Sequence, residues 1–301
     1  MIKPVEYYQG DYPNTRYAAP SEKGKTIKSS GCGITSAAMI IQTLRPDLKV
    51  TPPDTAKWSM AHGYKYAGQG TAYAYFVPQM KVYGLKCEML NSNNLYHNPG
   101  SSVHAKALKK LNEGCFIIAC MGPGTWTNGG HYIVLWKEAD GTVFINDPGS
   151  RQTYRAKNKY STFKNEVKYY WAVSYGKKCK AVKNGNIYNK KDVLKGKKGT
   201  ITAKSTVWIV KDCGDGWSIG TNGSVVGYIK NSIIDPKKGL STYKTVTIAV
   251  DTNLREKNNT KSKSLEKLAK GTKMSLITKR QKWANVKVGD KKGYVLISKF
   301  K

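Results

Sequence analysis

Hydrophobic residues change their spacing along the first half of the chain. Over residues 34–44 and 103–112 they recur three and four positions apart, as on the buried face of a helix. Over 115–121 they form a continuous apolar run of strand length, and over 131–146 two further strand-like runs follow one another. The pattern predicts an α+β unit in which 115–121 is a buried central strand.

The two later strands are interrupted once, by the sequence Glu138-Ala139-Asp140-Gly141. Turn-forming residues between two apolar runs predict a β-hairpin. If Lys137 pairs with Thr142, His131 comes to lie opposite Asp147, so the hairpin alone would bring an imidazole beside a carboxylate.

From about residue 177 the helical periodicity disappears and the chain repeats itself. Gly-Thr, Trp and Gly-Tyr occur twice in the same order, which indicates two copies of a small all-β module of about 55 to 60 residues. The matching positions are Gly199-Thr200 with Gly271-Thr272, Trp217 with Trp283, and Gly227-Tyr228 with Gly293-Tyr294. We therefore predict three domains, 1–175, 178–236 and 241–301, the last two joined by a linker at 235–240.

Charge is distributed unequally between these parts. Of the net charge of +32, residues 1–176 carry +10 and residues 177–301 carry +22. Such a field attracts polyanions, among them nucleic acid, anionic lipid and the teichoic acids of a Gram-positive wall. The lysines are scattered and form no DNA- or RNA-binding motif, so we expect no nucleic-acid partner.

Two further absences limit where the protein is expected to act. The sequence has no run of 18 apolar residues, so we expect no membrane insertion. Its first eight residues lack the apolar core of a signal peptide, so we expect synthesis in the cytoplasm without secretion by that route.

The six cysteines form no CxxC pair and no regular framework, so we expect reduced thiols and neither a disulfide scaffold nor a zinc site. Without an acidic calcium loop or an HExxH motif, no metal and no cofactor is expected. Small buried side chains are the expected state of the other five, Cys87, Cys115, Cys120, Cys179 and Cys213.

Cys32 is different because it lies between two glycines at the predicted start of a helix. The helix dipole and free backbone N–H groups there favour a thiolate. Cys32, His131 and Asp147 supply a nucleophile, a base and an orienting carboxylate in the chain order of papain-like enzymes. The alternative is a strand-edge histidine bonded to a backbone carbonyl and an ordinary turn aspartate. The other histidines, His62, His97 and His104, lie in no comparable context.

These motifs resemble the C39-like cysteine peptidases, a branch of the papain-like fold. The resemblance covers residues 1–175, with isoleucine at position 34 where proline is commoner. It implies that Cys32 is the nucleophile, His131 the base and Asp147 the orienter, and that Gln9 donates to the oxyanion. Gln42 and Gln69 are alternatives for that last role. The matching segments are Gly31-Cys32-Gly33-Ile34-Thr35-Ser36, Gly130-His131-Tyr132-Ile133-Val134 and Asn146-Asp147-Pro148.

The C-terminal copies resemble bacterial SH3-like wall-targeting modules, so the expected fold class is an α+β papain-like domain followed by two small all-β SH3-like barrels. The aromatic residues of the repeat, Trp217, Tyr228, Trp283 and Tyr294, are expected to fill the barrel cores. Tyr188 and Tyr243 are the better candidates for exposed ligand contacts.

A peptidase domain followed by two such modules looks like a phage endolysin or a related autolysin. We expect a monomer that binds peptidoglycan and anionic wall polymers of Gram-positive bacteria and acts at the cell wall. It would cut an amide bond in the peptide part through a thioacyl-enzyme, as an endopeptidase or an amidase. Trp126 and Tyr132, which lie close to the base in the sequence, are candidates for groove walls, with burial the favoured role for Tyr132. The rival functions are a non-catalytic wall-binding protein and a cysteine transpeptidase.

Overall fold

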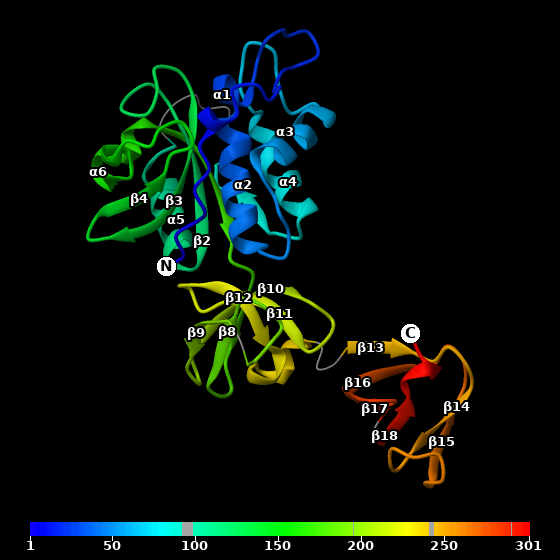
Figure 1. Cartoon of the computed structure of the whole chain (residues 1–301). Helices are drawn as coiled ribbons and strands as arrows, with labels where there is room; N and C mark the ends of the chain where they lie inside the picture. Colours follow the sequence, from blue (N-terminus) through cyan, green and yellow to red (C-terminus); the bar gives the residue numbers. More distant parts are fainter. Residues whose placement is uncertain (92–98, 195, 241–243, 290) are drawn as a thin grey trace. The chain divides into compact units, whose positions relative to one another are not determined.

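The computed structural model in Figure 1 describes residues 1–91, 99–194, 196–240, 244–289 and 291–301. Its contacts divide the chain into two compact units. The first comprises Met1–Lys178, Val207–Val210 and Gly220–Gly227, and the second comprises Cys179–Thr206, Lys211–Ile219 and Tyr228–Lys301. The domain boundaries at 175, 178, 236 and 241 stay predictions.

A six-stranded antiparallel sheet forms the centre of the first part of the chain, in the order β1-β6-β2-β3-β4-β5. Every residue of β2 is buried and β2 has a neighbour on both sides, which confirms the predicted central strand. A continuous apolar run is what a strand covered on both faces requires. The strands are β1 Cys87–Met89, β2 Cys115–Met121, β3 His131–Ala139, β4 Thr142–Asn146, β5 Lys157–Lys159 and β6 Val167–Ser174.

Helices cover both faces of this sheet. Figure 1 shows α2 (Cys32–Leu44), α3 (Pro52–Ala61) and α4 (Phe76–Val82) together on one side. On the other face α5 (Ser101–Asn112) packs against alternate residues of β2 and β3, among them Ile117 and Ile133. This alternation follows from the two-residue period of a strand. Two shorter helices are α1 (Ile27–Ser30) and α6 (Tyr160–Phe163).

The predicted helix over 34–44 is confirmed, but it has no solvent-exposed face. Every residue of α2 except Gln42 is buried. The helix is enclosed by the sheet, α3 and α4, so the residues between its large apolar positions are small ones that neighbours can cover.

The β3–β4 hairpin is confirmed, whereas its predicted register is wrong. Ala139 pairs with Thr142 around a two-residue turn, Asp140-Gly141, in which both residues have positive φ, 51° and 72°. This turn places Lys137 opposite Phe144, and a bulge between Leu135 and Lys137 then shifts the later pairs, so that Leu135 lies opposite Ile145. The tight turn wins because its backbone twist matches that of the flanking strands.

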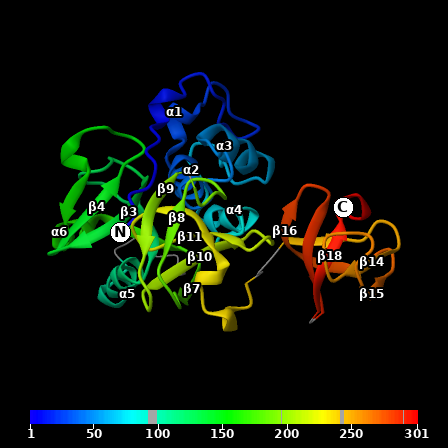
Figure 2. The ribbon, with the colours of Figure 1, turned by 60° about the horizontal axis from the view of Figure 1, so that its bottom comes forward.

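The remainder of the described chain is built from strands and short 3-10 turns, as predicted. Two six-stranded sheets follow, β7-β10-β11-β12-β8-β9 and β13-β16-β17-β18-β14-β15. Strand for strand the two orders are the same, which confirms the sequence repeat; several strands of the second sheet are visible in Figure 2. That these are SH3-like barrels stays a prediction. Bounds of the strands are β7 Lys177–Lys180, β8 Gly185–Tyr188, β9 Lys197–Ile201, β10 Thr206–Asp212, β11 Trp217–Thr221, β12 Val226–Lys230, β13 Lys244–Thr247, β14 Thr252–Arg255, β15 Ser264–Leu268, β16 Lys273–Arg280, β17 Trp283–Val288 and β18 Lys291–Leu296.

The aromatic residues of the repeat lie differently from their predicted positions. Trp217, Trp283, Tyr228 and Tyr294 are half-buried, and the buried cluster of the last module contains neither Trp283 nor Tyr294. Tyr188, predicted to be exposed, is buried with its ring 5.8 Å from that of Trp217, and Tyr243 lies outside the described residues. Aliphatic side chains such as Val286 and Val295 fill the core of the last module instead. No helix in the described residues has the length and apolarity to span a membrane.

Candidate active site

Cys32 is the first residue of α2 and follows directly on the short helix α1. The two flanking glycines are required by close contacts. A Cβ on Gly31 would lie 2.5 Å from the Ile27 carbonyl oxygen, and one on Gly33 would lie 2.6 Å from the Thr71 side chain. Glycine at these two positions therefore allows the start of α2 to pack closely against Ile27 and Thr71, and the Cys32 thiol faces a cleft.

His131 lies between Cys32 and Asp147. Its Nε2 is 2.6 Å from Asp147 Oδ1, and the imidazole is also hydrogen-bonded to the Cys32 thiol. With Nε2 engaged by the carboxylate, Nδ1 is the ring nitrogen left for the thiol. The structure thus brings the three predicted residues into one chain of hydrogen bonds, although the predicted hairpin register was wrong.

The surroundings lower the pKa of the Cys32 thiol and raise the pKa of the His131 imidazole, so both side chains favour their charged forms. Burial raises the pKa of Cys32, but the hydrogen bond and charge of His131 and the backbone N–H groups of Tyr132 and Gly33 bring it below the ordinary value of 9.0. Burial lowers the pKa of His131, whereas Asp147 and Cys32 raise it, for a net value of about 10. The pair is therefore arranged as thiolate and imidazolium over a wide neutral range.

Asp147 is held from three directions. Its side chain is 2% exposed, and besides His131 it accepts hydrogen bonds from the Gly149 backbone N–H (2.7 Å) and from Arg155 Nη1 (2.9 Å). A Cβ at position 149 would lie 2.8 Å from His131 Cε1, so only glycine fits there. These contacts fix the carboxylate that orients the imidazole.

Arg155 is a site residue that the sequence did not reveal. Its Nη2 donates to the carbonyl oxygens of Trp126 (2.6 Å) and Thr125 (3.0 Å), so it joins the loop before β3 to the carboxylate of Asp147. An arginine in a turn-rich stretch carries no periodic signal. Its planar, forked guanidinium suits this bridging role.

Trp126 does not form a groove wall, contrary to prediction. The ring is buried beneath Arg155 and packs edge-on against Phe163 at 6.0 Å. A large indole in a loop is stabilised more by joining the adjacent core than by exposure. Trp126 therefore supports Arg155 from below and lies outside the cleft that contains Cys32.

Replacing Arg155 with methionine is expected to lower kcat by about 10²-fold with little change in KM, because a displaced imidazole no longer meets the thiol in reactive geometry. Steady-state kinetics on purified walls, with the pH dependence of Cys32 alkylation as a second readout, checks this. Arg155→Lys should not rescue, since an ammonium cannot reproduce the fork. Arg16→Met, a change at an exposed arginine elsewhere, is the control; an unchanged kcat in Arg155→Met would contradict the assigned role.

Gln9 lies in the wall of the Cys32 cleft, as its predicted role requires. Its Nε2 donates one hydrogen to the Lys28 carbonyl oxygen at 2.8 Å, which leaves the second amide hydrogen for another acceptor. Gln69 also lines the cleft. Gln42 is excluded from the cleft, because its side chain accepts from the Val50 backbone N–H near the other end of α2.

The cleft has a volume of about 470 Å³. Tyr132 is part of its lining, but its ring is buried and its hydroxyl donates to the Thr71 carbonyl oxygen at 2.9 Å, so burial describes it better than the predicted groove wall. The exposed aromatic walls are Tyr66 and Tyr73, 53% and 37% exposed. Sequence reasoning missed both: Tyr66 lies in a glycine-rich loop and Tyr73 begins a short 3-10 helix, and neither setting has a period that marks it.

A buried ion pair holds the loop that carries Tyr66. Lys65 Nζ donates to Glu22 Oε2 (2.6 Å) and to the carbonyl oxygens of Tyr66 (2.8 Å) and Gln69 (2.5 Å). Glu22 also accepts from the backbone N–H groups of Ala19 and Gly68. All hydrogens of the ammonium are used, so the two loops that wall the cleft are tied together.

The Lys65–Glu22 pair is expected to stabilise the fold only while Glu22 is ionised. Hydrogen bonds from Lys65 and the backbone lower the pKa of Glu22 from 4.5 to about 2. A lowered carboxyl pKa adds stability that is present above pH 4.5 and lost as the pH falls toward 2. Thermal unfolding of wild type and Glu22→Gln between pH 7 and 2.5 checks this; equal slopes in acid would contradict it. Lys65→Met should lower Tm more than the double variant Glu22→Gln/Lys65→Met does, because only the single variant leaves the Glu22 carboxylate without its cation.

The other histidines and cysteines take no part in the cleft's hydrogen-bonded triad. His62 Nδ1 bonds the Trp58 carbonyl oxygen, His104 bonds the Tyr170 hydroxyl, and His97 lies outside the described residues. Burial raises the pKa of Cys87 and Cys120 to about 12 and that of Cys115 to about 11. Within the described ranges no group of three His, Cys, Asp or Glu side chains is suited to a metal ion, and none of the cysteines is joined in a disulfide.

The chain was compared with known proteins. A family model described as the Peptidase_C39 like family matches residues 9–179. A comparison with curated proteins found no match.

Three solved structures show distant similarity. One described as a C39-like peptidase from Bacillus anthracis is 14% identical, with 54% of this chain and 94% of that chain covered and a TM-score of 0.34. Ly7917 with the hydrolyzing product of MDP is 14% identical, covering 67% and 88% at a TM-score of 0.23. NlpC2 from Trichomonas vaginalis is 9% identical, covering 41% and 46% at 0.20. These TM-scores are low, so the description of the site depends on this chain's own geometry.

Proposed function

Because this chain belongs to the Peptidase_C39 like family, we propose that it is a cysteine hydrolase with Cys32 as nucleophile, His131 as acid and base, and Asp147 as the group that orients His131. The observation that carries the proposal is the chain of hydrogen bonds from thiol to imidazole to carboxylate. A thiolate with a lowered pKa beside an imidazolium with a raised pKa is the resting state that such a reaction needs.

In the proposed reaction, the Cys32 thiolate attacks the carbonyl carbon of an amide and forms a tetrahedral intermediate. The free amide hydrogen of Gln9 supplies a donor for the oxyanion, worth about 10² to 10³ in turnover in comparable sites. His131 gives its proton to the departing amine, which leaves a thioester. His131 then takes a proton from water as the water attacks, and the carboxylic acid is released with the Cys32 thiolate and the His131 imidazolium restored.

The proposed substrate is an amide bond in the peptide part of Gram-positive peptidoglycan. Tyr66 and Tyr73 would contact the peptide from the cleft wall. The C-terminal modules, which hold most of the +32 charge, would bind anionic wall polymers and raise the local enzyme concentration, a gain that reaches about 10² to 10⁴ in avidity where geometry permits. This combination supports a phage-type endolysin or an autolysin acting at the bacterial cell wall.

Mass spectrometry of fragments released from purified Gram-positive sacculi tests the proposal. Hydrolysis predicts new free amino groups and new carboxylates at one bond type, which also separates an endopeptidase from an amidase. Binding to walls without new termini would instead favour a non-catalytic wall-binding protein. With an added amine nucleophile, an amide-linked product would indicate a transpeptidase.

A further inference from the structure

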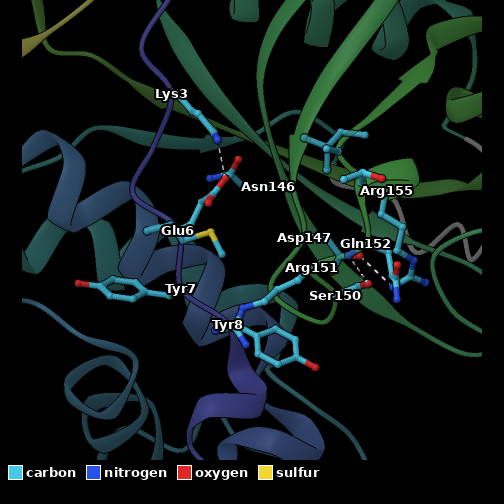
Figure 3. Close-up of a pocket in the computed structure, with 14 residues that line it drawn as sticks. Lys3, Glu6, Tyr7, Tyr8, Asn146, Asp147, Ser150, Arg151, Gln152 and Arg155 are labelled. Atoms are coloured by element: carbon cyan, nitrogen blue, oxygen red, sulfur yellow. Dashed lines mark hydrogen bonds and ion pairs between the residues drawn. The ribbon is translucent and has the colours of Figure 1, made fainter.

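A second cavity lies behind the proposed triad, on the far side of the His131–Asp147 hydrogen bond from Cys32. It has a volume of about 540 Å³ and is lined by the N-terminal segment, the end of β4 and the loop 147–156 (Figure 3). We call it the back cavity. It shares no lining residue with the cleft, but Asp147 lines the back cavity while His131 lines the cleft. The volume is in the range of small-molecule sites.

Arg151 supplies an available cation in this cavity. Figure 3 shows its side chain reaching across to Tyr8, where the guanidinium lies 4.3 Å from the ring centroid. A Cβ on Gly10 would lie 2.3 Å from the same ring, so Tyr8 is held in place between them. Of the three guanidinium nitrogens of Arg151, only Nη2 has a hydrogen-bond partner among the described residues, the carboxylate of Asp11. The side chains of Arg151 and Asp11 are 66% and 47% exposed. Exposed pairs are worth little, so a carboxylate can share or replace Asp11.

The wall also contains one acceptor and one donor that the described protein leaves unpaired. Asn146 is 4% exposed, and its Nδ2 donates to the Pro4 carbonyl oxygen at 3.2 Å while its Oδ1 has no partner. Arg155 uses both Nη atoms, whereas its buried Nε has no partner. Buried polar atoms are rarely left unpaired, so the two atoms mark a polar part of the wall whose hydrogen bonding the described protein leaves incomplete.

We propose that the back cavity binds an N-acylated amino acid or the carboxylate end of a short peptide, and that its occupancy acts on His131 through Asp147. The carboxylate would pair with Arg151, whose planar fork matches it, and the acyl group would lie in the cavity beside Asn146. The effect on His131 rests on the proposed function. Hydrolysis of a peptide amide creates a new carboxylate end, so this class of ligand is also the product class of that reaction.

The binding test uses full-length Cys32→Ala protein titrated with N-acetyl-alanine and, separately, with its uncharged amide. Calorimetry should show the acid binding at least about 10-fold more tightly than the amide, and Arg151→Gln should lose about 10-fold in affinity for the acid. Arg16→Gln, an exposed arginine outside both cavities, should bind as the parent does. Equal affinity for acid and amide, or no loss in Arg151→Gln, would overturn the proposal. So would loss of binding when Cys32 of the wild type is blocked with iodoacetamide, since the ligand would then occupy the cleft.

The coupling test measures the rate of Cys32 alkylation in wild type and in Arg151→Gln, with and without saturating N-acetyl-alanine. We expect the acid to change the rate at least about twofold in wild type and not in Arg151→Gln, because the change passes through Asp147. An unchanged rate in wild type would refute the coupling. Neither test uses turnover, so failure of the proposed hydrolysis would appear separately, as intact muropeptides.

Discussion

The variant Cys32→Ala is expected to lose hydrolysis of purified Gram-positive walls by about 10⁴-fold or more, because no other group in the cleft can form the thioacyl intermediate. Burial raises the pKa of the thiols of Cys87, Cys115 and Cys120 to about 11 or 12, so these thiols cannot substitute for Cys32. Release of new amino groups, measured over a fixed time by mass spectrometry, gives the size of the loss.

Two controls separate chemistry from folding and binding in this experiment. Cys87→Ala removes a half-buried thiol in β1, outside the cleft, and should keep wild-type turnover. Sedimentation with walls should show Cys32→Ala bound as tightly as wild type, since the basic C-terminal modules are unchanged. Full hydrolysis by Cys32→Ala would reject the cysteine mechanism.

Replacing His131 with glutamine is expected to have the second largest effect, a loss of about 10³ to 10⁴ in kcat together with a change in Cys32 itself. In wild type the hydrogen bond and charge of His131 outweigh the effect of burial on the thiol pKa. Without the imidazolium, burial dominates, so the pKa of Cys32 rises above its ordinary value of 9.0 and the thiolate is lost at neutral pH.

Iodoacetamide labelling of Cys32 as a function of pH measures this change directly. Wild type should label well below pH 9, and His131→Gln only in more alkaline solution. Turnover by wild type should fall again as the pH rises through about 10, because His131 then loses the proton that it gives to the leaving amine. Coincident labelling curves for the two proteins would show that His131 does not control the thiol.

Local sequence patterns account for most of the secondary structure near the site. The apolar run 115–121 became β2 with the same limits, and the helix that begins at Cys32 ends at Leu44. Spacing of apolar residues and turn chemistry act over a few residues, so they are readable without knowledge of the fold. The repeat is equally local, because each copy carries its own Gly-Thr, Trp and Gly-Tyr signals and forms its own sheet.

Side-chain roles that depend on distant neighbours were harder to predict. Trp126 and Tyr132 are both aromatic residues near His131, yet both are buried, while Tyr66 and Tyr73 reach the cleft. An aromatic side chain has similar apolar area in either role, and only the surrounding core decides whether that area is covered. The hairpin register failed for a local reason, because the chain turns within two residues, Asp140-Gly141, instead of the four that pairing of Lys137 with Thr142 requires.

By itself, the sequence determined the helices over 34–44 and 103–112, the central strand 115–121, the hairpin that follows it, the position of Cys32 at a helix start and the repeat in the basic C-terminal part. Only the tertiary structure decided that Arg155 holds Asp147, that Lys65 and Glu22 tie the cleft loops and that a second cavity adjoins the site. Periodicity is set by neighbours along the chain. Charge pairs between residues tens of positions apart leave no periodic trace, because folding alone brings those residues together.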